Sequence, residues 1–235
     1  MIDLHSHILP CVDDGSQSVE ESIELLRALA AQGVHTVCAT PHFEATSDSP
    51  TRFLARRDRA YEQLASAVQG LSLPRVLLGA EVAYFSGIAN SQVLQDLRLQ
   101  QSSLLLVEMP MGVWSDYSVK ELIQMACSSE VTPVLAHIER YLSFVNRRTL
   151  DELAQHGVLM QLNAPSFARW SLRGRMTRLI RDGYVQFIAS DCHNMQSRPP
   201  RFDLARERIA GALGDAALSH MDRLAESYFS PQSQP

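Results

Sequence analysis

The sequence predicts an α/β protein whose parallel strands close into a barrel, and three observations support this fold class. Seven apolar runs alternate with amphipathic helical stretches, a pattern typical of parallel strands joined by helical crossovers. Nearly every apolar run ends in a side chain that can bind a metal ion, rather than in an ordinary turn residue. The 235 residues, 46% of them hydrophobic and 20% charged, suffice for one sizeable core.

An open, doubly wound sheet is the alternative way to arrange the same strands. Ligands of such a sheet gather at one topological switch point. In a closed barrel, the chemistry can come from the C-terminal ends of all the strands. Because metal-binding side chains follow strands along the whole length of the sequence, we favour the barrel.

The first apolar run, residues 2–4, predicts a buried strand that leads directly into His5 and His7. Side chains alternate along an extended chain, so both imidazoles should point to the same side. A turn is predicted at residues 11–15, where Gly15 is free to adopt a positive φ.

A serine N-cap opens the first predicted helix. Ser18 is followed three positions later by Glu21, the pattern of a capping box, and Gly33 ends the amphipathic stretch. Further strands are predicted at residues 34–39, 76–80, 103–107, 131–136, 158–162 and 185–189. Further helices are predicted at residues 52–68, 92–97, 120–127, 149–156, 175–182, 204–213 and 216–228. We expect one domain over residues 1–229 and a disordered tail at 230–235.

Composition argues against several classes of function. The formal net charge of −5 favours neither nucleic acid nor a membrane surface as a partner. The four cysteines are scattered, without the spacing of a disulfide framework or a zinc site, which suits a reducing compartment. Because the sequence shows neither a secretion signal nor a membrane-spanning apolar segment, we expect a cytoplasmic protein. The oligomeric state stays open.

The residues that follow the predicted strands indicate a metal centre at the mouth of the barrel. Imidazole and carboxylate groups are common metal ligands, and a buried carboxylate is costly without a nearby cation. So many ligands exceed the needs of one tetrahedral ion, and we expect two or three ions that share carboxylates, with Mn, Fe, Zn and Mg all compatible. The candidates are His5, His7, His42, Glu81, Glu108, His137, Asn163, Asp191 and His193.

Several of the polar residues have structural alternatives. His137 could be a core histidine that is hydrogen-bonded to the backbone. Asp13 and Asp14 are ambiguous, because one of them could simply organise the turn. Cys192 lies between two candidate ligands, but alternation turns it away, so we expect it to contribute only to packing. Three further histidines are expected to be structural, namely His35, His156 and His220.

Four sequence motifs resemble the polymerase and histidinol phosphatase (PHP) superfamily. They are HSHILP followed by VDDG, TPH at His42, AHIERY at His137, and ASDCHN followed by RPP. Within the superfamily, the HIERY and SRPP elements are similar to those of bacterial manganese-dependent protein tyrosine phosphatases of capsule and exopolysaccharide operons. The similarity extends from Met1 to about residue 213.

The resemblance implies a distorted TIM-like (β/α)7 barrel, the PHP fold, with a trinuclear site that holds manganese. It also implies two substrate-facing arginines, Arg140 and Arg198, and assigns no role to the loop at residues 114–117. By similarity, the first ion would be held by His5, His7, Glu81 and Asp191, the second by Glu81, Glu108 and His137, and the third by Asp14, His42 and His193.

The implied reaction is the hydrolysis of phosphotyrosine on a protein. Metal ions lower the pKa of a bound water, which would supply hydroxide for in-line attack on phosphorus. Arg140 and Arg198 would bind the phosphoryl oxygens, and a solvated ion pair with Glu139 or a neighbour is their structural alternative. A phenolate with a parent pKa of about 10 leaves readily, so the reaction needs no assigned general acid.

The resemblance also implies a partner, the tyrosine autokinase of polysaccharide export. An arginine-rich stretch, residues 169–181, could meet an acidic, phosphotyrosine-bearing segment of this partner, although a solvated helix face is the simpler interpretation.

Three other functions remain as alternatives. The nearest is a PHP phosphoesterase that acts on a small molecule such as histidinol phosphate. A nuclease or proofreading role is disfavoured by the acidic balance and the lack of a basic groove. A purely structural metal centre is disfavoured because such sites are usually closed, are smaller and need no paired arginines at the rim.

Overall fold

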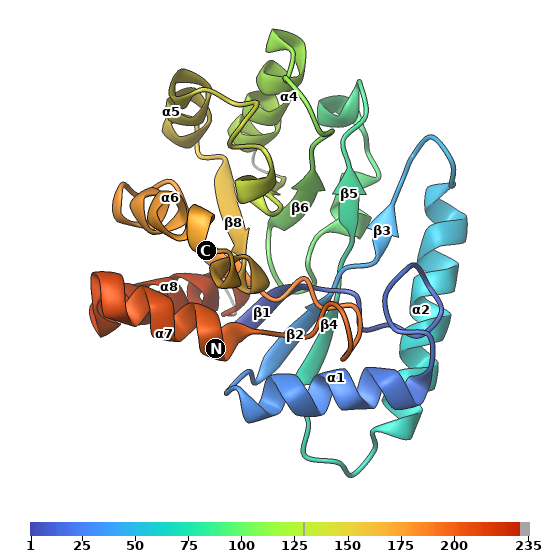
Figure 1. The fold of residues 1–235 in the computed structure, drawn as a ribbon. Coiled ribbons are helices and arrows are strands. Elements are labelled where there is room, and N and C mark those ends of the chain that lie inside the picture. The colour runs from blue at the N-terminus through green and yellow to red at the C-terminus, as the bar shows by residue number, and fades with distance from the viewer. Residues whose placement is uncertain (129, 231–235) are drawn as a thin grey trace.

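The computed structural model describes residues 1–128 and 130–230, and Figure 1 shows its strands in the middle of the molecule with helices around them. The strands are β1 (Ile2–Ser6), β2 (Thr36–Ala39), β3 (His42–Phe43), β4 (Arg75–Leu78), β5 (Glu81–Ala83), β6 (Leu104–Glu108), β7 (Thr132–Leu135), β8 (Leu159–Asn163) and β9 (Phe187–Ala189).

The helices follow the strands in alternation. The α-helices are α1 (Val19–Ala31), α2 (Pro50–Ala67), α3 (Leu94–Leu97), α4 (Asp116–Cys127), α5 (Arg147–Gln155), α6 (Trp170–Arg181), α7 (Phe202–Leu213) and α8 (Asp215–Phe229). Three short 3-10 helices are η1 (Ile88–Asn90), η2 (Ile138–Arg140) and η3 (Ala164–Ala168).

The strands form a curled, all-parallel sheet that closes on itself. One part has the strand order β1-β2-β4, and the other has the order β3-β5-β6-β7-β8-β9. The last strand returns to the first, because Asp191 N–H donates to the His5 carbonyl and His7 N–H donates to the Cys192 carbonyl, each at 2.9 Å. The predicted barrel is therefore confirmed, and the open sheet is excluded.

Two of the seven predicted strands are interrupted, which corrects the expectation that each simply ends in a polar residue. β2 resumes as β3 after Thr40 and Pro41, and β4 resumes as β5 after Gly79 and Ala80. The resumed segments pair with each other, with His42 opposite Glu81. Proline lacks the N–H that a continuous ladder needs, and a Cβ at Gly79 would lie 2.5 Å from the Leu99 side chain.

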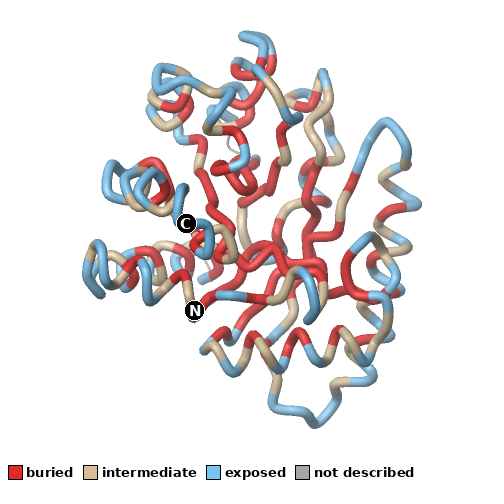
Figure 2. Tube along the Cα trace, in the orientation of Figure 1, coloured by how far each residue is buried: buried red, intermediate tan, exposed pale blue. Residues whose placement is uncertain are grey.

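Figure 2 shows that the strands are buried and that the helices expose their outer faces. Alternate residues of the strands form an apolar cluster inside the barrel, to which Leu104 and Leu106 of β6 belong. Ala225 and Phe229 of α8 close this cluster at the N-terminal ends of the strands. Glu108 lies two residues beyond Leu106, so the same face of β6 passes from the apolar interior to the mouth.

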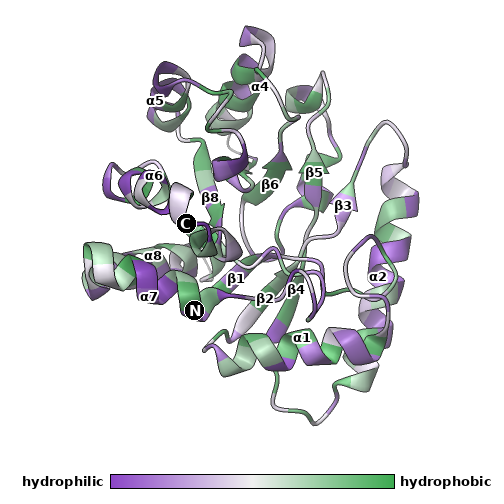
Figure 3. Ribbon diagram, in the orientation of Figure 1, coloured by the Kyte–Doolittle hydropathy of each residue, from purple (hydrophilic) through white to green (hydrophobic). Residues whose placement is uncertain are grey.

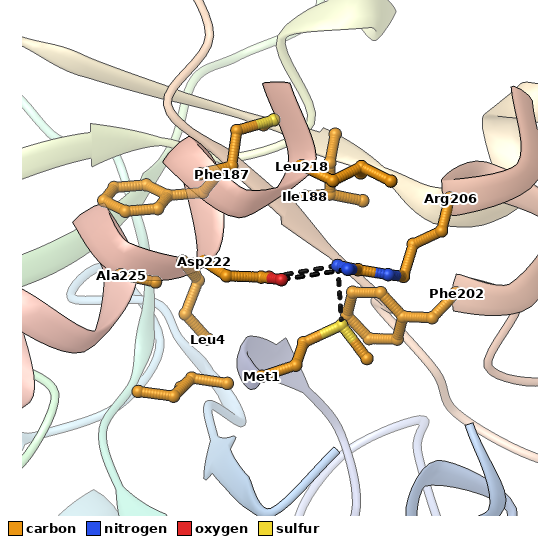
Figure 4. A pocket seen from close by; sticks show the side chains of 11 residues that line it. Met1, Leu4, Phe187, Ile188, Phe202, Arg206, Leu218, Asp222 and Ala225 are labelled. Carbon is orange, nitrogen blue, oxygen red and sulfur yellow. Dashed lines mark hydrogen bonds and ion pairs between the residues drawn. The ribbon is translucent and has the colours of Figure 1, made fainter. Parts of the chain in front are cut away.

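A small pocket marks the closed end of the barrel, where α7 and α8 meet β1 (Figure 4). Arg206 and Asp222 form a bidentate ion pair there, with N–O distances of 3.0 and 2.9 Å. The Met1 sulfur lies 3.3 Å from the same guanidinium group. The lining is otherwise mostly apolar, as expected for a region that supports the fold.

The helices show the apolar and polar faces that the sequence predicts, and Figure 3 shows both colours along α1 and α2. Ser18 caps α1 by accepting from the Glu21 N–H, and Gly33 has the positive φ of a helix end, at 85°. Two helices begin four or more residues earlier than predicted. α4 begins at Asp116 after the Ser115 cap, and α6 begins at Trp170, five residues before the expected start.

The turn after β1 corrects the expectation for Gly15. Cys11, and not Gly15, has a positive φ in this turn, at 57°. Gly15 is needed for a different reason, because an added Cβ would lie 2.2 Å from the His7 carbonyl oxygen. Ser230 is described as the residue that ends α8, while the rest of the expected tail, residues 231–235, lies outside the described residues. Among the residues described, no helix combines the length and apolarity that crossing a bilayer requires.

Candidate metal centre

β1 brings the two N-terminal histidines together at the mouth of the barrel. The Nε2 atoms of His5 and His7 lie 3.2 Å apart, so the prediction that both rings point the same way is confirmed. The β1–β2 register shifts between Asp3 and Ser6, which inserts one extra residue into β1 just where it leaves the apolar interior. Both histidines are fully buried.

Glu81 lies at the centre of the cluster. Its carboxylate is 1% exposed and contacts four imidazoles, which come from β1, β3 and the end of β7. The nitrogen–oxygen distances are 3.2 Å to His5, 3.3 Å to His7, 3.1 Å to His42 and 2.9 Å to His137. A single carboxylate shared by so many imidazoles has the geometry of a bridging ligand.

His137 and Asp191 reach the cluster through strained backbone. Both have positive φ, at 33° and 49°, a conformation that non-glycine residues rarely adopt. Asp191 lies 3.5 Å from both His5 and His7. It also contacts Asn163 Nδ2, at 2.5 Å, His193 Nδ1, at 3.6 Å, and the two arginines predicted from the sequence.

Asp14, His42 and His193 form the outer part of the cluster. Asp14 Oδ1 lies 3.4 Å from His42 Nε2 and 3.3 Å from His193 Nε2. With His7, these three residues offer four ligand atoms that all lie within 4.8 Å of one another. Two further groups meet the same distance criterion, one of His5, His7 and Glu81 and one of His42, Glu81 and Glu108. Every predicted ligand therefore lies in or beside one cluster.

Arg140 and Arg198 border the cluster and are about one-third exposed. Arg140 contacts Glu108 at 3.4 Å and Asp191 at 2.9 Å, whereas Arg198 contacts Asp14 and Asp191 at 3.2 Å. Glu139, the expected alternative partner, is buried and accepts instead from the Ser166 hydroxyl at 2.7 Å. Both guanidinium groups are thus held at the metal cluster.

Several supporting residues were not assigned from the sequence. Asp13 accepts from His7 Nδ1 at 2.7 Å and from the N–H groups of Gly15 and His42. The same carboxylate therefore both organises the turn and fixes the orientation of the His7 ring. Gln161 Oε1 accepts from the His137 N–H at 2.8 Å and lies 3.3 Å from His5 Nδ1. A lone glutamine inside the apolar run of β8 was the signal that could have identified Gln161.

The loop at residues 114–117, which had no predicted role, contacts the centre indirectly. Trp114 packs edge-on against Tyr141, with 5.1 Å between the ring centroids. The Tyr141 hydroxyl lies 3.4 Å from His137 Nδ1. The indole therefore supports the ring that positions a candidate ligand.

The residues expected to be structural lie away from the cluster or point out of it. Cys192 is fully buried in the apolar core, as predicted. His35 pairs with Glu226 at 3.5 Å at the closed end, and His156 bonds to the backbone of α5. Two arginines of the arginine-rich stretch at residues 169–181 also donate to backbone carbonyls. Arg173 donates to the Phe167 carbonyl, and Arg175 donates to the Leu142 carbonyl.

Contacts within the cluster strongly shift the pKa values of its own histidines. Burial disfavours the charged imidazole of His7, but hydrogen bonds to Asp13 and Glu81 outweigh it and raise the pKa of His7 to about 10. Glu108 and Glu81 likewise overcome burial and raise the pKa of His137 to about 9. In contrast, burial and the neighbouring His7 lower the pKa of His193 to about 4. The carboxylates thus attract positive charge into a buried site.

Divalent metal ions match this set of donors. His193 Nε2 is buried and makes no hydrogen bond to any described residue, although Asp14 Oδ1 is only 3.3 Å away, an arrangement that a shared cation would satisfy. The donors are all imidazole nitrogens and carboxylate oxygens, which suits Mn, Fe or Zn. The same atoms bind protons when no metal is present, which explains the raised pKa values.

Comparison with known proteins agrees with this chemistry. A family model described as "Capsular polysaccharide synthesis, CpsB/CapC" matches residues 1–224. The tyrosine-protein phosphatase CpsB of Streptococcus agalactiae serotype III is 30% identical over 216 residues, which span 85% of this chain and 86% of that protein.

Solved structures match the fold as well as the sequence. One comes from work on YwqE of Bacillus subtilis and CpsB of Streptococcus pneumoniae, described as unique metal-dependent tyrosine phosphatases. It has a TM-score of 0.85, with 26% identity, over 99% of this chain and 96% of that one. A histidinol phosphate phosphatase of Lactococcus lactis matches at a TM-score of 0.58 and 13% identity, over 90% and 92% of the two chains, which shows a shared fold.

Proposed function

Because the chain belongs to the CpsB/CapC family of capsular polysaccharide synthesis proteins, we propose that it is a metal-dependent phosphatase that removes phosphate from tyrosine residues of a protein. One observation carries this proposal. Seven candidate histidine and carboxylate ligands from distant parts of the chain surround Glu81 and Asp191, and two arginines border them. Hydrolysis of a phosphate ester is promoted by metal ions, which activate water, and by guanidinium groups, which bind the phosphoryl oxygens, and this site has residues for both roles.

Three metal positions are proposed within the cluster. His5, His7, Glu81 and Asp191 would hold the first ion, Glu81, Glu108 and His137 the second, and Asp14, His42 and His193 the third. The atoms within each group lie close together, and His42, which is 3.1 Å from Glu81 and 3.4 Å from Asp14, lies between the second and third positions. When bound, divalent ions supply positive charge for the phosphoryl oxygens and lower the pKa of water. Mn is proposed as the metal, and the donor set also accepts Fe or Zn.

The arginines would bind and orient the phosphoryl group. Each presents a planar fork of N–H donors that matches two phosphate oxygens. Arg140 and Arg198 approach Asp191 from η2 and from the loop after β9, so an anion at the mouth would be held from two directions. Each guanidinium would exchange part of its contact with a carboxylate for one with the substrate.

Other residues of the chain keep the ligands in place. Asp13 fixes the orientation of His7, and Asn163 donates to Asp191, so neither ligand has to reorganise when substrate binds. The leaving group would be a phenolate, whose parent pKa of about 10 makes protonation less necessary than for an alkoxide. This favours phosphotyrosine over an aliphatic phosphate such as histidinol phosphate.

The proposed partner is the tyrosine autokinase of polysaccharide export, and the proposed location is the cytoplasm. The four cysteines are free thiols, in agreement with a reducing compartment.

Substrate preference tests the proposed function. Purified protein reconstituted with Mn²⁺ is expected to hydrolyse a phosphotyrosine peptide faster than a phosphoserine peptide or histidinol phosphate, and a chelator should abolish the activity. A preference for histidinol phosphate would instead indicate a small-molecule phosphoesterase. No hydrolysis of any of the three with the metals bound would indicate a structural centre.

The two arginines are tested separately. Arg140→Ala and Arg198→Ala should each lower kcat/KM on aryl phosphates by about 10²- to 10³-fold, as expected when a charged donor to the transition state is lost. Metal content measured by mass spectrometry should stay at the wild-type level. Arg181→Ala, on the exposed end of α6, is the matched control. Unchanged turnover in both variants would remove the arginines from the mechanism.

A further inference from the structure

Exposed apolar side chains gather at the mouth of the barrel. Among the described residues, seven large apolar side chains are exposed, and Leu71 alone lies in a loop at the opposite end. The other six follow the C-terminal ends of β6, β7, β8 and β9, and we call them the mouth rim: Met111, Val113, Tyr117, Phe144, Trp170 and Met195. Exposed apolar groups around an active site are typical of a surface that binds another protein chain.

A cleft leads from the two site arginines toward the start of α6. Arg140, Arg198, Ser166 and Arg169 all line it, and Trp170 directly follows Arg169 in the sequence. Trp170, the first residue of α6, is 83% exposed. A polypeptide that placed a phosphate between Arg140 and Arg198 would therefore run past Arg169 and Trp170.

Arg169 differs from the other two arginines of the cleft in its pairing. Arg140 and Arg198 both contact carboxylates of the metal cluster. Within residues 1–128 and 130–230, no carboxylate lies within ion-pair distance of Arg169. Its guanidinium is exposed and free to meet an anion that arrives with the substrate.

We propose that Arg169 and Trp170 form a subsite for an acidic residue next to the phosphotyrosine of a polypeptide substrate. This inference rests on the proposed phosphatase function and adds a sequence preference to it. Arg169 lines the same cleft as Arg140 and Arg198, and neighbouring residues of an extended peptide are only about 3.3 Å apart, so a residue close to the phosphotyrosine in the peptide is the one that would meet Arg169. The indole of Trp170 offers a broad apolar face against which the same residue or its neighbour can pack.

Two matched phosphotyrosine peptides test the subsite. They differ only in having glutamate or glutamine at the positions that flank the phosphotyrosine, and the readout is the ratio of their kcat/KM values with Mn²⁺-loaded enzyme. The wild type should prefer the glutamate peptide. Arg169→Gln should lower this preference by about fivefold, which is the effect expected from the loss of one exposed ion pair. The change should appear in KM and not in kcat. Arg169→Glu should reverse it.

Two further variants make the test specific. Arg181→Gln removes an exposed arginine from the other end of α6 and should keep the wild-type preference. Trp170→Ala should raise KM for both peptides alike, because an apolar contact does not depend on the flanking charge.

An unchanged ratio in Arg169→Gln, or equal KM values for the two peptides in the wild type, would overturn the subsite while the phosphatase function stands. No turnover of either peptide by the wild type would contradict the phosphatase function itself.

Discussion

At the closed end of the barrel, apolar side chains of the strands pack against α8, whereas at the mouth the same strands lead into buried histidines and carboxylates. Leu104 and Phe187 belong to the first region, and Glu81 and His7 to the second. All four are almost completely buried. Burial stabilises the fold by roughly 25 cal/mol per Å² at the apolar end, but it costs free energy at the mouth, where the charged forms lose water.

The difference shows which region the chain keeps for stability and which for chemistry. At the closed end, the buried contacts of the interior cluster are apolar and favour the folded state. At the mouth, the buried charges are tolerated because they neutralise one another, and the strained backbone at His137 and Asp191 adds a further cost. We therefore expect substitutions at the two ends to affect different measurements.

The largest expected effect is on activity, from a substitution at the mouth. Glu81→Gln keeps the size of the side chain but removes the charge shared by four histidines. We expect kcat to fall at least about 10³-fold, equivalent to roughly 4 kcal/mol of transition-state stabilisation, with lower metal content.

Glu121→Gln is the matched control for that variant. Glu121 is also buried, but its carboxylate accepts from the Tyr84 hydroxyl and the Gly87 N–H, and it belongs to none of the proposed ligand groups. Its replacement should leave metal content unchanged. If Glu81→Gln retained both its metal and its activity, Glu81 would not be a shared ligand.

The next effect is on stability, from the closed end. Leu104→Ala opens a cavity in the fully buried interior cluster and should lower the free energy of unfolding by about 3 kcal/mol. Turnover per folded molecule should stay near the wild-type value, because Leu104 begins β6 and so lies at the end of the strand opposite the mouth. Denaturant unfolding measures the first quantity, and exposed Leu71→Ala, expected to change it by less than about 0.5 kcal/mol, is the control. A loss of activity without a loss of stability would contradict the division between the two ends.

The smallest expected effect concerns pH and the metal-free protein. The pKa of His7 rises from 6.5 to about 10 on folding, and that of His137 rises to about 9. Protons on these groups stabilise the fold fully below pH 6.5, and this contribution is lost as pH rises through 9 and 10. The free energy of unfolding of chelator-treated protein should fall across this range, by at most about 1.4 kcal/mol per pH unit for each proton.

Asp13→Asn removes one of the two carboxylates that raise the pKa of His7, so it should flatten this pH dependence. Metal-loaded protein should also show little of the dependence, since metals replace the protons. Stability that rises with pH in the chelated wild type would contradict the assignment.

Much of the fold followed from local patterns in the sequence. The alternation of strands and helices predicted the parallel barrel, and the capping pattern at Ser18 predicted the start of α1. The interruptions between β2 and β3 and between β4 and β5 could not be predicted from local sequence patterns. They depend on how Pro41 and Gly79 meet neighbouring strands, and such contacts between distant segments leave no periodic signal.

The candidate site was predictable because its ligands come directly after apolar runs. A charged residue at such a position is expected to be buried, which costs free energy unless a cation or another partner is present. Its supporting residues were harder to assign. Asn163 was recognised as polar, but its hydrogen bond to Asp191 depends on the β8–β9 register. Arg169 was counted among the arginines of a solvated helix, because the sequence does not show that the cleft passes along its side.

The hydrogen bonds between β1 and the residues after β9 join a segment that is synthesised first to one that is synthesised near the end of translation. Between His5 and Asp191, a ribosome adds 186 residues, which takes roughly 10 to 40 s. During this time the N-terminal histidines have no partner strand on one side, and the nascent chain can present only part of the ligand set. We therefore expect the full set of candidate ligands to assemble only at the end of biosynthesis, after the last strand has left the ribosome.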